Sequence, residues 1–302
     1  MGQYFLGQIA GLATAVCWTV TAIVFEHAGR RVGSLVVNWI RLAIALIGFA
    51  LLSLVRYGSL LPYGATTEMW IALMASGVAG LALGDLFLFE AFVMIGSRLS
   101  MLVYTSVPIL TALLGWIFLG ETMRPVEFAG MLLIISGIVL AVVFRTPPHG
   151  ADRPNISLKT LLMGVLLALL GALGQAGGLV ISKHAAPDFD AFSATYIRVI
   201  AGLAGFSIII PVMRRIKRLF AAFSDSSAMR SIIIGAFFGP FLGISLGLFA
   251  AQATTAALSA TLMALVPVFI IPPSVIIYKE KLGLMEIIGT VLAVAGTVVV
   301  FL

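Results

Sequence analysis

The chain has 302 residues, of which 61% are hydrophobic and only 10% are charged, and its mean hydropathy is +1.17. A soluble globular domain carries about 25% charged residues, so the composition excludes the ordinary soluble classes and predicts a polytopic membrane protein. The net charge of +6 comes mainly from Lys and Arg in short segments between apolar runs. Membrane topology explains this distribution better than a nucleic-acid partner does.

A membrane-spanning helix needs about 20 mostly apolar residues, and ten such runs follow one another along the chain. They cover residues 5–25, 35–55, 69–95, 99–119, 126–144, 161–181, 192–212, 232–251, 258–277 and 285–302. A linker with three prolines separates two sets of five. We therefore predict an all-α polytopic membrane protein with ten transmembrane helices: a five-helix repeat at 1–145, a linker at 146–159 and a second five-helix repeat at 160–302.

The two halves share a register of landmark residues. Arg41 matches Arg198 at an offset of 157 (198 − 41), and Gly84 matches Gly243 at an offset of 159 (243 − 84). Further pairs at the second offset are Ser100 and Ser259, Pro108 and Pro267, Glu127 and Glu286, Gly130 and Gly289, and Gly137 and Gly296. An odd number of spans per repeat inverts the second copy relative to the first. Inverted repeats are typical of secondary transporters, with a substrate site between the halves near the membrane midplane.

Lys and Arg are distributed unevenly between the two sides of the predicted topology. The odd-numbered loops and the linker carry 13 of these residues, and the opposite side carries 3. The positive-inside rule then places the odd-numbered loops in the cytoplasm and both termini outside. We expect an integral protein of a bacterial inner (plasma) membrane.

Two matching stretches carry a resemblance to a known family. They are SVPILTALLGWIFLGE at 106–121 and LVPVFIIPPSVIIYKE at 265–280, and ATAVCWTVTA at 13–22 supports them. Over essentially its whole length the chain resembles the EamA-type members of the drug/metabolite transporter superfamily. The resemblance implies inverted five-helix repeats, a central cavity, and export or uptake of small metabolites or drug-like compounds, but no particular substrate. Gly84-Asp85 in the third span and Pro272-Pro273 in the ninth depart from the usual pattern.

Charged residues deep within the spans are the first candidates for a functional site, because each costs about 2.5 to 3.5 kcal/mol to insert. Arg41 and Asp85 lie roughly 5 to 6 Å from the midplane on the same predicted side, so their side chains can meet. One hypothesis is a permanent ion pair that fixes helix packing. The other is that Asp85 or Glu90 exchanges a proton during transport. Glu90 lies nearer the surface, where we expect it to reach water or Arg98.

Arg198 matches Arg41 in the repeat, but the second half lacks the corresponding carboxylates. Two interpretations are open. Arg198 extends outward to Asp188, Asp190 and helix-end carbonyls, or it presents its charge to an anionic group of the substrate.

The remaining candidates are aromatic or polar residues and helix bends. The set of substrate-binding candidates consists of Trp18, Tyr104, Gln175, Arg198 and Ser245. Trp18 and Gln175 match across the repeats, and a cavity-lining role competes with simple core packing. For Tyr104 and Ser245, the alternative to substrate binding is a structural role. Pro108 and Pro267 each free a backbone carbonyl within a span, which predicts bends at matching places in both halves.

We expect a secondary transporter that exports amino-acid-like or drug-like solutes by alternating access. A flippase for lipids or lipid head groups and an uncoupled facilitator are the alternatives on the same fold. HExxH and Walker-type motifs are absent, so we expect no enzymatic activity, metal or cofactor. The expected partners are a small-molecule substrate, membrane lipid and, under the coupling hypothesis, protons, but no nucleic acid. Substrate identity, direction and oligomeric state do not follow from the sequence.

Overall fold

The computed structural model is helical, and no strand occurs among the residues it describes. These are residues 2–119, 124–144, 157–185, 189–243, 246–247, 250, 262, 265–278 and 282–300. Seven helical segments are long and apolar enough to cross a membrane: Tyr4–Val32, Ser34–Tyr57, Thr67–Ile95, Ser97–Phe118, Pro125–Val143, Leu158–Ser182 and Phe192–Val212. The all-α class is therefore confirmed. The count of ten spans stays a prediction, because the last three predicted spans contain shorter described helices.

The helices follow the chain in two sets. The first half contains α1 (Gly2–Val32), α2 (Ser34–Tyr57), α3 (Thr67–Gly77), η1 (Val78–Gly84), α4 (Asp85–Ile95), α5 (Ser97–Tyr104), α6 (Val107–Leu119) and α7 (Pro125–Val143). The second half contains α8 (Leu158–Ala185), α9 (Ala191–Val212), α10 (Ile216–Ala222), α11 (Ser226–Ala236), η2 (Phe237–Gly243), α14 (Val266–Phe269), α15 (Ile271–Tyr278) and α16 (Leu284–Val300).

Single glycines make the tightest connections between helices. Gly33 joins α1 to α2 with φ = 94°, and Gly96 joins α4 to α5 with φ = 86°. Residues with a Cβ rarely adopt such positive φ values. Each glycine therefore lets the chain reverse without a loop, which keeps the ends of α1, α2, α4 and α5 close together.

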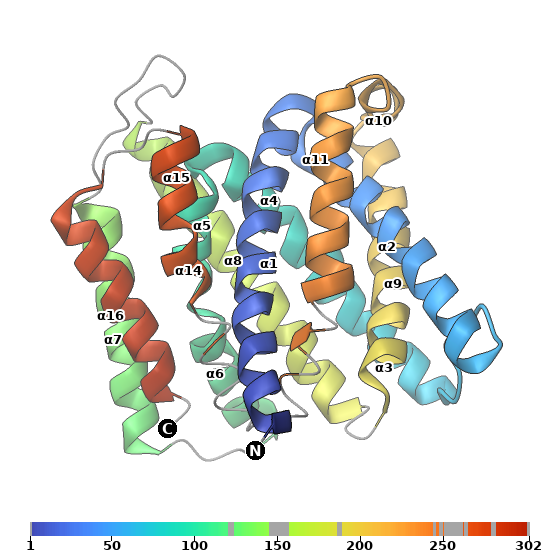
Figure 1. The fold of residues 1–302 in the computed structure, drawn as a ribbon, viewed down its shortest axis with the longest axis horizontal. Coiled ribbons are helices and arrows are strands. Elements are labelled where there is room, and N and C mark those ends of the chain that lie inside the picture. Colours follow the sequence, from blue (N-terminus) through green and yellow to red (C-terminus); the bar gives the residue numbers. More distant parts are fainter. Residues whose placement is uncertain are drawn as a thin grey trace.

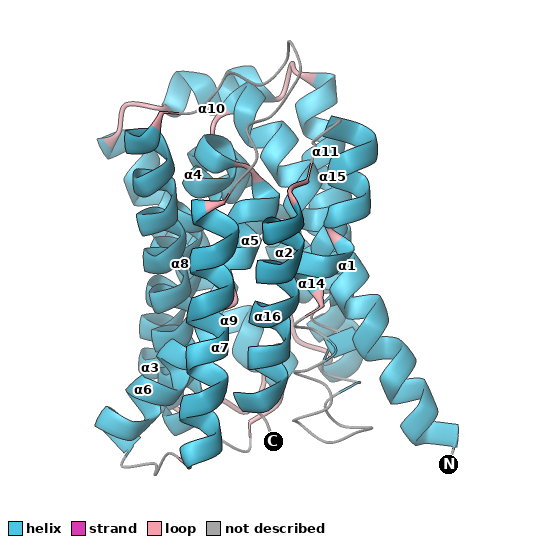
Figure 2. Ribbon diagram, turned by 90° about the vertical axis from the view of Figure 1, so that its left-hand side faces the viewer, coloured by secondary structure: helices cyan, strands magenta, loops and turns pink. Residues whose placement is uncertain are grey.

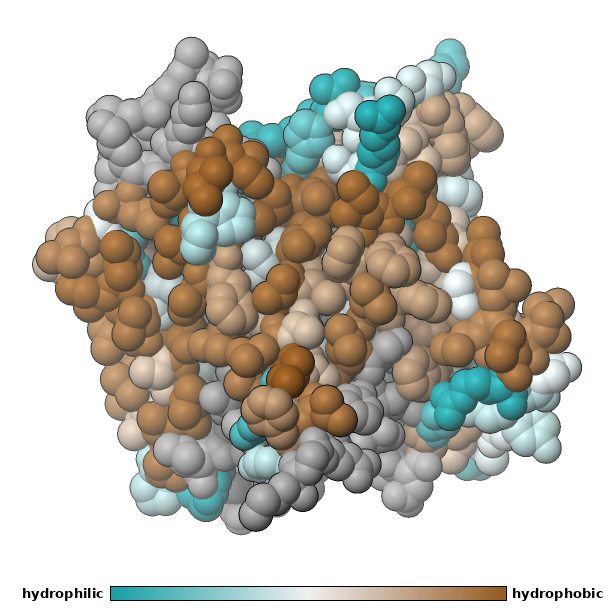
Figure 3. Space-filling view, in the orientation of Figure 1, coloured by the Kyte–Doolittle hydropathy of each residue, from teal (hydrophilic) through white to brown (hydrophobic). Residues whose placement is uncertain are grey.

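The helices stand side by side with both termini at one end and α10 at the opposite end (Figure 1). After a quarter-turn, α7 and α16 lie together at the front of the bundle (Figure 2). A broad hydrophobic band crosses the middle of the molecule, and hydrophilic residues gather toward its two ends (Figure 3). Exposed apolar side chains such as Leu132, Val139 and Val291 are what a surface facing lipid requires.

The third span of the first half packs against α8. The Ser76 hydroxyl lies 2.5 Å from the carbonyl oxygen of Gly178 and 2.7 Å from the Ser182 hydroxyl. Further along, a Cβ added at Gly174 would lie 2.7 Å from the Cα of Gly84. Residue numbers rise on one helix as they fall on the other, so the two segments are antiparallel. Small residues let the backbones approach this closely.

The same contact recurs between α1 and the segment formed by α11 and η2. A Cβ added at Gly235 would lie 2.3 Å from the Phe25 ring, and one added at Gly243 would lie 3.4 Å from the Trp18 indole. These helices are also antiparallel. At the offset of 159, Gly84 corresponds to Gly243. The contact of η1 with α8 and the contact of η2 with α1 are therefore two copies of one interface.

The pair formed by α7 and α16 is a third interface with this symmetry. A Cβ at Gly137 would lie 2.4 Å from the carbonyl oxygen of Gly289, and one at Gly296 would lie 2.7 Å from that of Gly130. Gly130 matches Gly289 and Gly137 matches Gly296 in the repeat, so exchanging the helices reproduces both contacts. An antiparallel interface of this kind fits inverted repeats.

Two π-helical segments also occupy matching positions. Shifting η1 (78–84) by 159 residues gives 237–243, which is η2. η2 contains Pro240, but Leu81 stands at the matching place in η1, so a proline is not needed to widen the helix. η1 faces the glycines of α8, and the glycines of η2 face Thr21 and Trp18 of α1. π-helical turns occur frequently at functional sites, which directs attention to the side chains around them.

Candidate functional site

Arg41 and Asp85 form a buried ion pair between α2 and α4. Only 4% of Arg41 and 7% of Asp85 is exposed. Asp85 is the first residue after η1, so the π-helical segment sets the direction in which its carboxylate leaves the helix. An ion pair at this depth offsets the cost of placing either charge in an apolar interior.

Asn38 and two aromatic rings hold the Arg41 guanidinium in place. Its Nε donates to Asn38 Oδ1 (2.9 Å), and Asn38 Nδ2 donates to the carbonyl oxygen of Asp85 (3.3 Å). The guanidinium carbon lies 4.6 Å from the centroid of the Phe89 ring and 5.8 Å from that of Phe25. Hydrogen bonds, an ion pair and cation–π contacts together make Arg41 a fixed part of the core.

Arg198, on α9, lies beside η1 and has a different environment. Its Nε and Nη2 atoms are buried, and neither has a hydrogen-bond partner among the described residues. A Cβ added at Gly80 would lie 3.1 Å from Arg198 Nη2 and 3.3 Å from Gln175 Oε1. The missing side chain of Gly80 therefore leaves the space in which the guanidinium and the amide approach each other. Unpaired buried donors are costly, which marks Arg198 as a candidate ligand-binding group.

The central charged residues form one electrostatic cluster. Asp85 interacts with both Arg41 and Arg198, and Tyr104 on α5 interacts with all three. Tyr104, Gln175 and Arg198 are each half-buried. We call Arg41, Asp85, Tyr104, Gln175 and Arg198 the central cluster. Because one carboxylate faces two guanidinium groups, the central cluster has an excess positive charge.

Asp190, one of the two outward partners considered for Arg198, is engaged by other residues. It accepts hydrogen bonds from the backbone N–H and hydroxyl of Ser193 (2.9 and 3.0 Å) and lies 3.7 Å from Arg56. It caps α9, so its carboxylate is already engaged. Asp188, the other expected partner, lies outside the described residues.

The other candidates lie at the bends and along the interfaces. Half-buried Trp18 borders Gly243 at the end of η2, just as Gln175 lies beside the glycines of η1. Pro108 is the second residue of α6, directly after the break at residues 105–106, and Pro267 is the second residue of α14. Both prolines therefore stand at matching helix starts. Ser245 lies outside the described residues.

Of the two contacts expected for Glu90, water or Arg98, the one with Arg98 is not among the hydrogen bonds and ion pairs of the described residues. The hydroxyl of Ser34 donates to Glu90 Oε2 (2.5 Å), whereas Arg98 Nη1 lies 3.2 Å from Oε1 of Glu286. The reason is the turn at Gly96, which begins a new helix and directs Arg98 toward α16. Glu90 is half-buried and lines a cavity of about 230 Å³ at the α10 end of the bundle.

Glu26 is a buried carboxylate that the sequence reasoning missed. Only 1% of it is exposed; it accepts from Arg30 Nε (3.1 Å) and from the backbone N–H of Ser97 (2.6 Å). It therefore caps the start of α5 from α1. The available signal was its spacing of four residues from Arg30, which places both side chains on one helix face.

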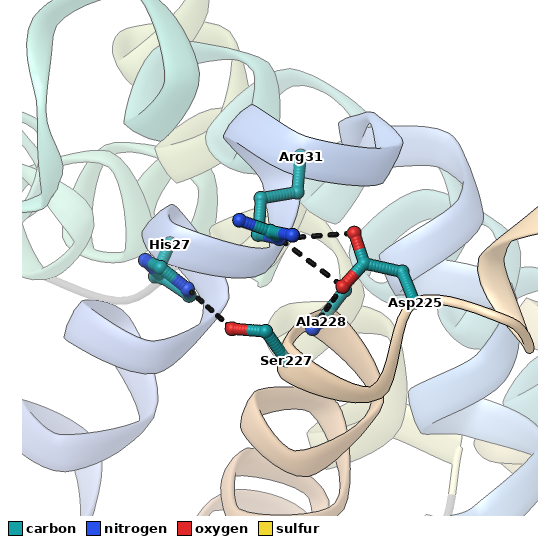
Figure 4. Close-up of polar contacts among 5 residues, drawn as sticks. All are labelled: His27, Arg31, Asp225, Ser227 and Ala228. Atoms are coloured by element: carbon teal, nitrogen blue, oxygen red, sulfur yellow. Dashed lines mark hydrogen bonds and ion pairs between the residues drawn. The ribbon is translucent and has the colours of Figure 1, made fainter.

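A separate polar network joins α1 to α11 at the α10 end (Figure 4). Arg31 Nε donates to both carboxylate oxygens of Asp225 (3.2 and 2.9 Å), and Asp225 Oδ1 accepts from the backbone N–H of Ala228 (3.0 Å). The backbone hydrogen bond from Ala228, together with Arg31, lowers the pKa of Asp225 below its ordinary value of 3.8. His27 Nε2 lies 3.2 Å from the Ser227 hydroxyl.

Comparisons with known proteins agree with this arrangement. The model of the EamA-like transporter family matches residues 5–143 and again residues 162–302. A solved structure described only as a crystal structure of a protein aligns with a TM-score of 0.63 and 19% sequence identity, covering 97% of this chain and 95% of the other. At that identity the likeness concerns the fold alone. A comparison with curated proteins gave no match.

Proposed function

The chain belongs to the EamA-like transporter family, and from this premise we propose that it is a secondary transporter for small metabolites that carry an anionic group, such as a carboxylate. It moves them by alternating access of its two repeats, in the export direction. The family consists of membrane transporters, not enzymes. The anionic substrate group and the direction of transport are our own additions to that family-level function.

The single observation that carries the proposal is the unpaired Arg198. Its buried Nε and Nη2 have no hydrogen-bond partner among the described residues, and a buried donor without a partner costs about 1 to 3 kcal/mol. A carboxylate or similar anion would satisfy both donors in a bidentate geometry. The excess positive charge of the central cluster would favour the same ligand.

The neighbours of Arg198 supply the remaining chemistry of such a site. Gln175 offers an amide beside the guanidinium, and Tyr104 adds a ring and a hydroxyl within electrostatic range. Sites for small solutes combine apolar walls with a few convergent polar groups. An amino-acid-like or aromatic acid fits that combination better than a simple cation does.

For proton coupling, Glu90 is the stronger of the two candidate carboxylates. Protonating Asp85 would leave the buried Arg41 without its counter-charge. Glu90 makes no ion pair with a described residue and lines a cavity at the end of the bundle. We therefore propose that Asp85 holds α2 and α4 together while Glu90 exchanges the proton.

The test uses proteoliposomes loaded with a mixture of amino acids, aromatic acids and organic cations. Efflux is measured with and without a proton gradient for the intact protein and for Arg198→Gln, Arg198→Lys, Glu90→Gln and Arg56→Gln. For the intact protein we expect efflux of the acids only. Arg198→Gln should reduce it by roughly 10- to 100-fold, the value for a hydrogen bond to a charged group, and Arg198→Lys should restore part of it.

Arg56→Gln is the matched control, because it removes a positive charge outside the central cluster. Its efflux should remain near that of the intact protein. Glu90→Gln should abolish the effect of the gradient while leaving downhill efflux measurable. Efflux of organic cations would contradict the anion-binding role of Arg198. An equal reduction of acid efflux in Arg198→Gln and Arg56→Gln would contradict it as well.

A further inference from the structure

A second positively charged site lies at the α10 end of the bundle, away from the central cluster. The cavity of about 230 Å³ that Glu90 borders is formed by the turn between α1 and α2, by α4 and by the start of α10. Its charged lining residues are Arg30, Arg31, Glu90, Arg215 and Arg218. Four guanidinium groups and one carboxylate thus surround a space large enough for a small anion.

Two of these arginines are not neutralised. Arg30 pairs with Glu26 (3.1 Å) and Arg31 pairs with Asp225 (2.9 Å). Arg215 and Arg218 make no ion pair with any described residue. The Glu90 carboxylate accepts the Ser34 hydroxyl, so two free cations face one acid and the cavity keeps an excess positive charge.

The beginning of α2 adds to this charge. Gly33, the residue before α2, has no side chain to cap the helix, and Ser34, Leu35 and Val36 of its first turn line the cavity. The N-terminus of a 24-residue helix attracts anions through its backbone N–H groups and dipole. A Cβ at Gly33 would lie 3.6 Å from Arg218 Nη1, so this guanidinium extends over the same turn. The helix start and the unpaired arginines therefore converge.

Exposed apolar side chains lie on and next to α10, beside the arginines of the cavity. On α10, Phe220 is 68% exposed and Ile216 is 45% exposed, while Leu219 is buried against the bundle. Phe223, which follows α10, is 52% exposed. Large exposed apolar side chains beside cationic ones are typical of segments that lie in the interface between water and lipid. An anion that binds here would therefore also meet a surface suited to acyl chains.

We propose that this cavity binds the phosphate of an anionic phospholipid, with Arg215, Arg218 and the start of α2 as the phosphate ligands. Basic pockets at the ends of membrane helices take lipid head groups in this way. The apolar side chains of α10 and Phe223 contact the glycerol and the first acyl methylenes. The lipid then links α2, α4 and α10 at the end of the bundle.

The test measures lipid retention by native mass spectrometry of the purified, delipidated full-length protein. Phosphatidylglycerol is titrated against phosphatidylcholine, and glycerol 3-phosphate and inorganic phosphate are titrated separately. The variant is Arg215→Gln/Arg218→Gln. Its matched control is Lys217→Gln/Arg230→Gln, which removes two positive charges near the same end but none from the cavity lining. Arg218→Gln alone serves if the double variant does not fold.

We expect the intact protein to prefer phosphatidylglycerol, and the cavity variant to bind it about 30-fold more weakly, the value for two cationic side chains beside an anionic lipid surface. The control should retain most of the preference. Glu90→Gln should strengthen binding, because it removes the one acid that faces the cavity. Equal losses in variant and control, or weaker binding by Glu90→Gln, would overturn the proposal. Binding of inorganic phosphate as tight as that of phosphatidylglycerol would show that the ligand is a free phosphate and not a lipid.

Discussion

Arg41 and Arg198 occupy equivalent positions in the two repeats, but their surroundings differ. Arg41 has an aspartate, an asparagine and two aromatic rings around it. Arg198 has buried nitrogen atoms without partners among the described residues. The π-helical segments lie at matching places in both halves, so the difference comes from the side chains around each arginine. Asp85 follows η1, whereas residue 244, which is Ile, follows η2. The loss of this acid is one of several changes that separate a structural arginine from one available to a ligand.

Removing one member of the neutralised pair tests this comparison most strongly. We expect Asp85→Asn to lower the free energy of unfolding by roughly 3 to 5 kcal/mol, the usual cost of leaving a buried charge without its partner. Arg41→Gln should have a similar effect. The measurement is the melting temperature of the detergent-solubilised protein.

Arg198→Gln is the control for that experiment, because it removes the matching charge from the other repeat. No ion pair is lost, so its melting temperature should equal or exceed that of the intact protein. The double variant Arg41→Gln/Asp85→Asn should be more stable than the sum of the single losses predicts. A loss in Arg198→Gln as large as that in Arg41→Gln would mean that both arginines are structural.

The two matching glycines of the α7–α16 interface, unlike the two arginines, should show similar losses of stability on substitution. We expect Gly137→Ala and Gly296→Ala each to cost about 1 to 3 kcal/mol, since the added methyl meets backbone atoms that cannot rotate away. Gly177→Ala is the control, because a Cβ there meets nothing within 4 Å. It should be neutral, or stabilising by up to about 1 kcal/mol. A large cost at only one of the two interface glycines would show that the repeats pack differently from the described contact.

The smallest effect is expected at the network that joins α1 to α11. Because the pKa of Asp225 is lowered in the folded protein, its carboxylate stabilises the fold above pH 3.8 and loses this contribution as the pH falls through the lowered pKa. Asp225→Asn should reduce the melting temperature slightly at pH 7, and the difference should shrink below pH 3.8. Glu68→Gln is the matched control, at an exposed acid that makes no ion pair with a described residue, and should leave the melting temperature at pH 7 unchanged.

Much of the fold was predictable because membrane insertion imposes strong rules on sequence. Apolar run length indicated the helices, and the repeat register predicted which glycines correspond. The register also suggested that Trp18 and Gln175 occupy related places. The depth of Arg41 and Asp85 showed that they could meet, since both displacements from the midplane point to one side.

Other features depend on contacts that no local pattern specifies. The π-helical segments lie against the other half of the molecule, and in the sequence only Pro240 hinted at one of them. The position of Arg198 beside Gly80 and Gln175 requires knowledge of how α9 crosses η1. The turn at Gly96 directs Arg98 toward Glu286, so Arg98 does not form the ion pair with Glu90 that was one of two expected contacts.

The close crossing of α7 and α16 has a consequence for biosynthesis. Gly137 and Gly289 are separated by 152 residues (289 − 137), which at 5 to 20 residues per second is roughly 8 to 30 seconds of translation. During that interval the glycine face of α7 has no partner and borders lipid or the insertion machinery. A half-made chain therefore exposes a close-packing surface on α7, which docking of α16 covers once the second repeat has been made.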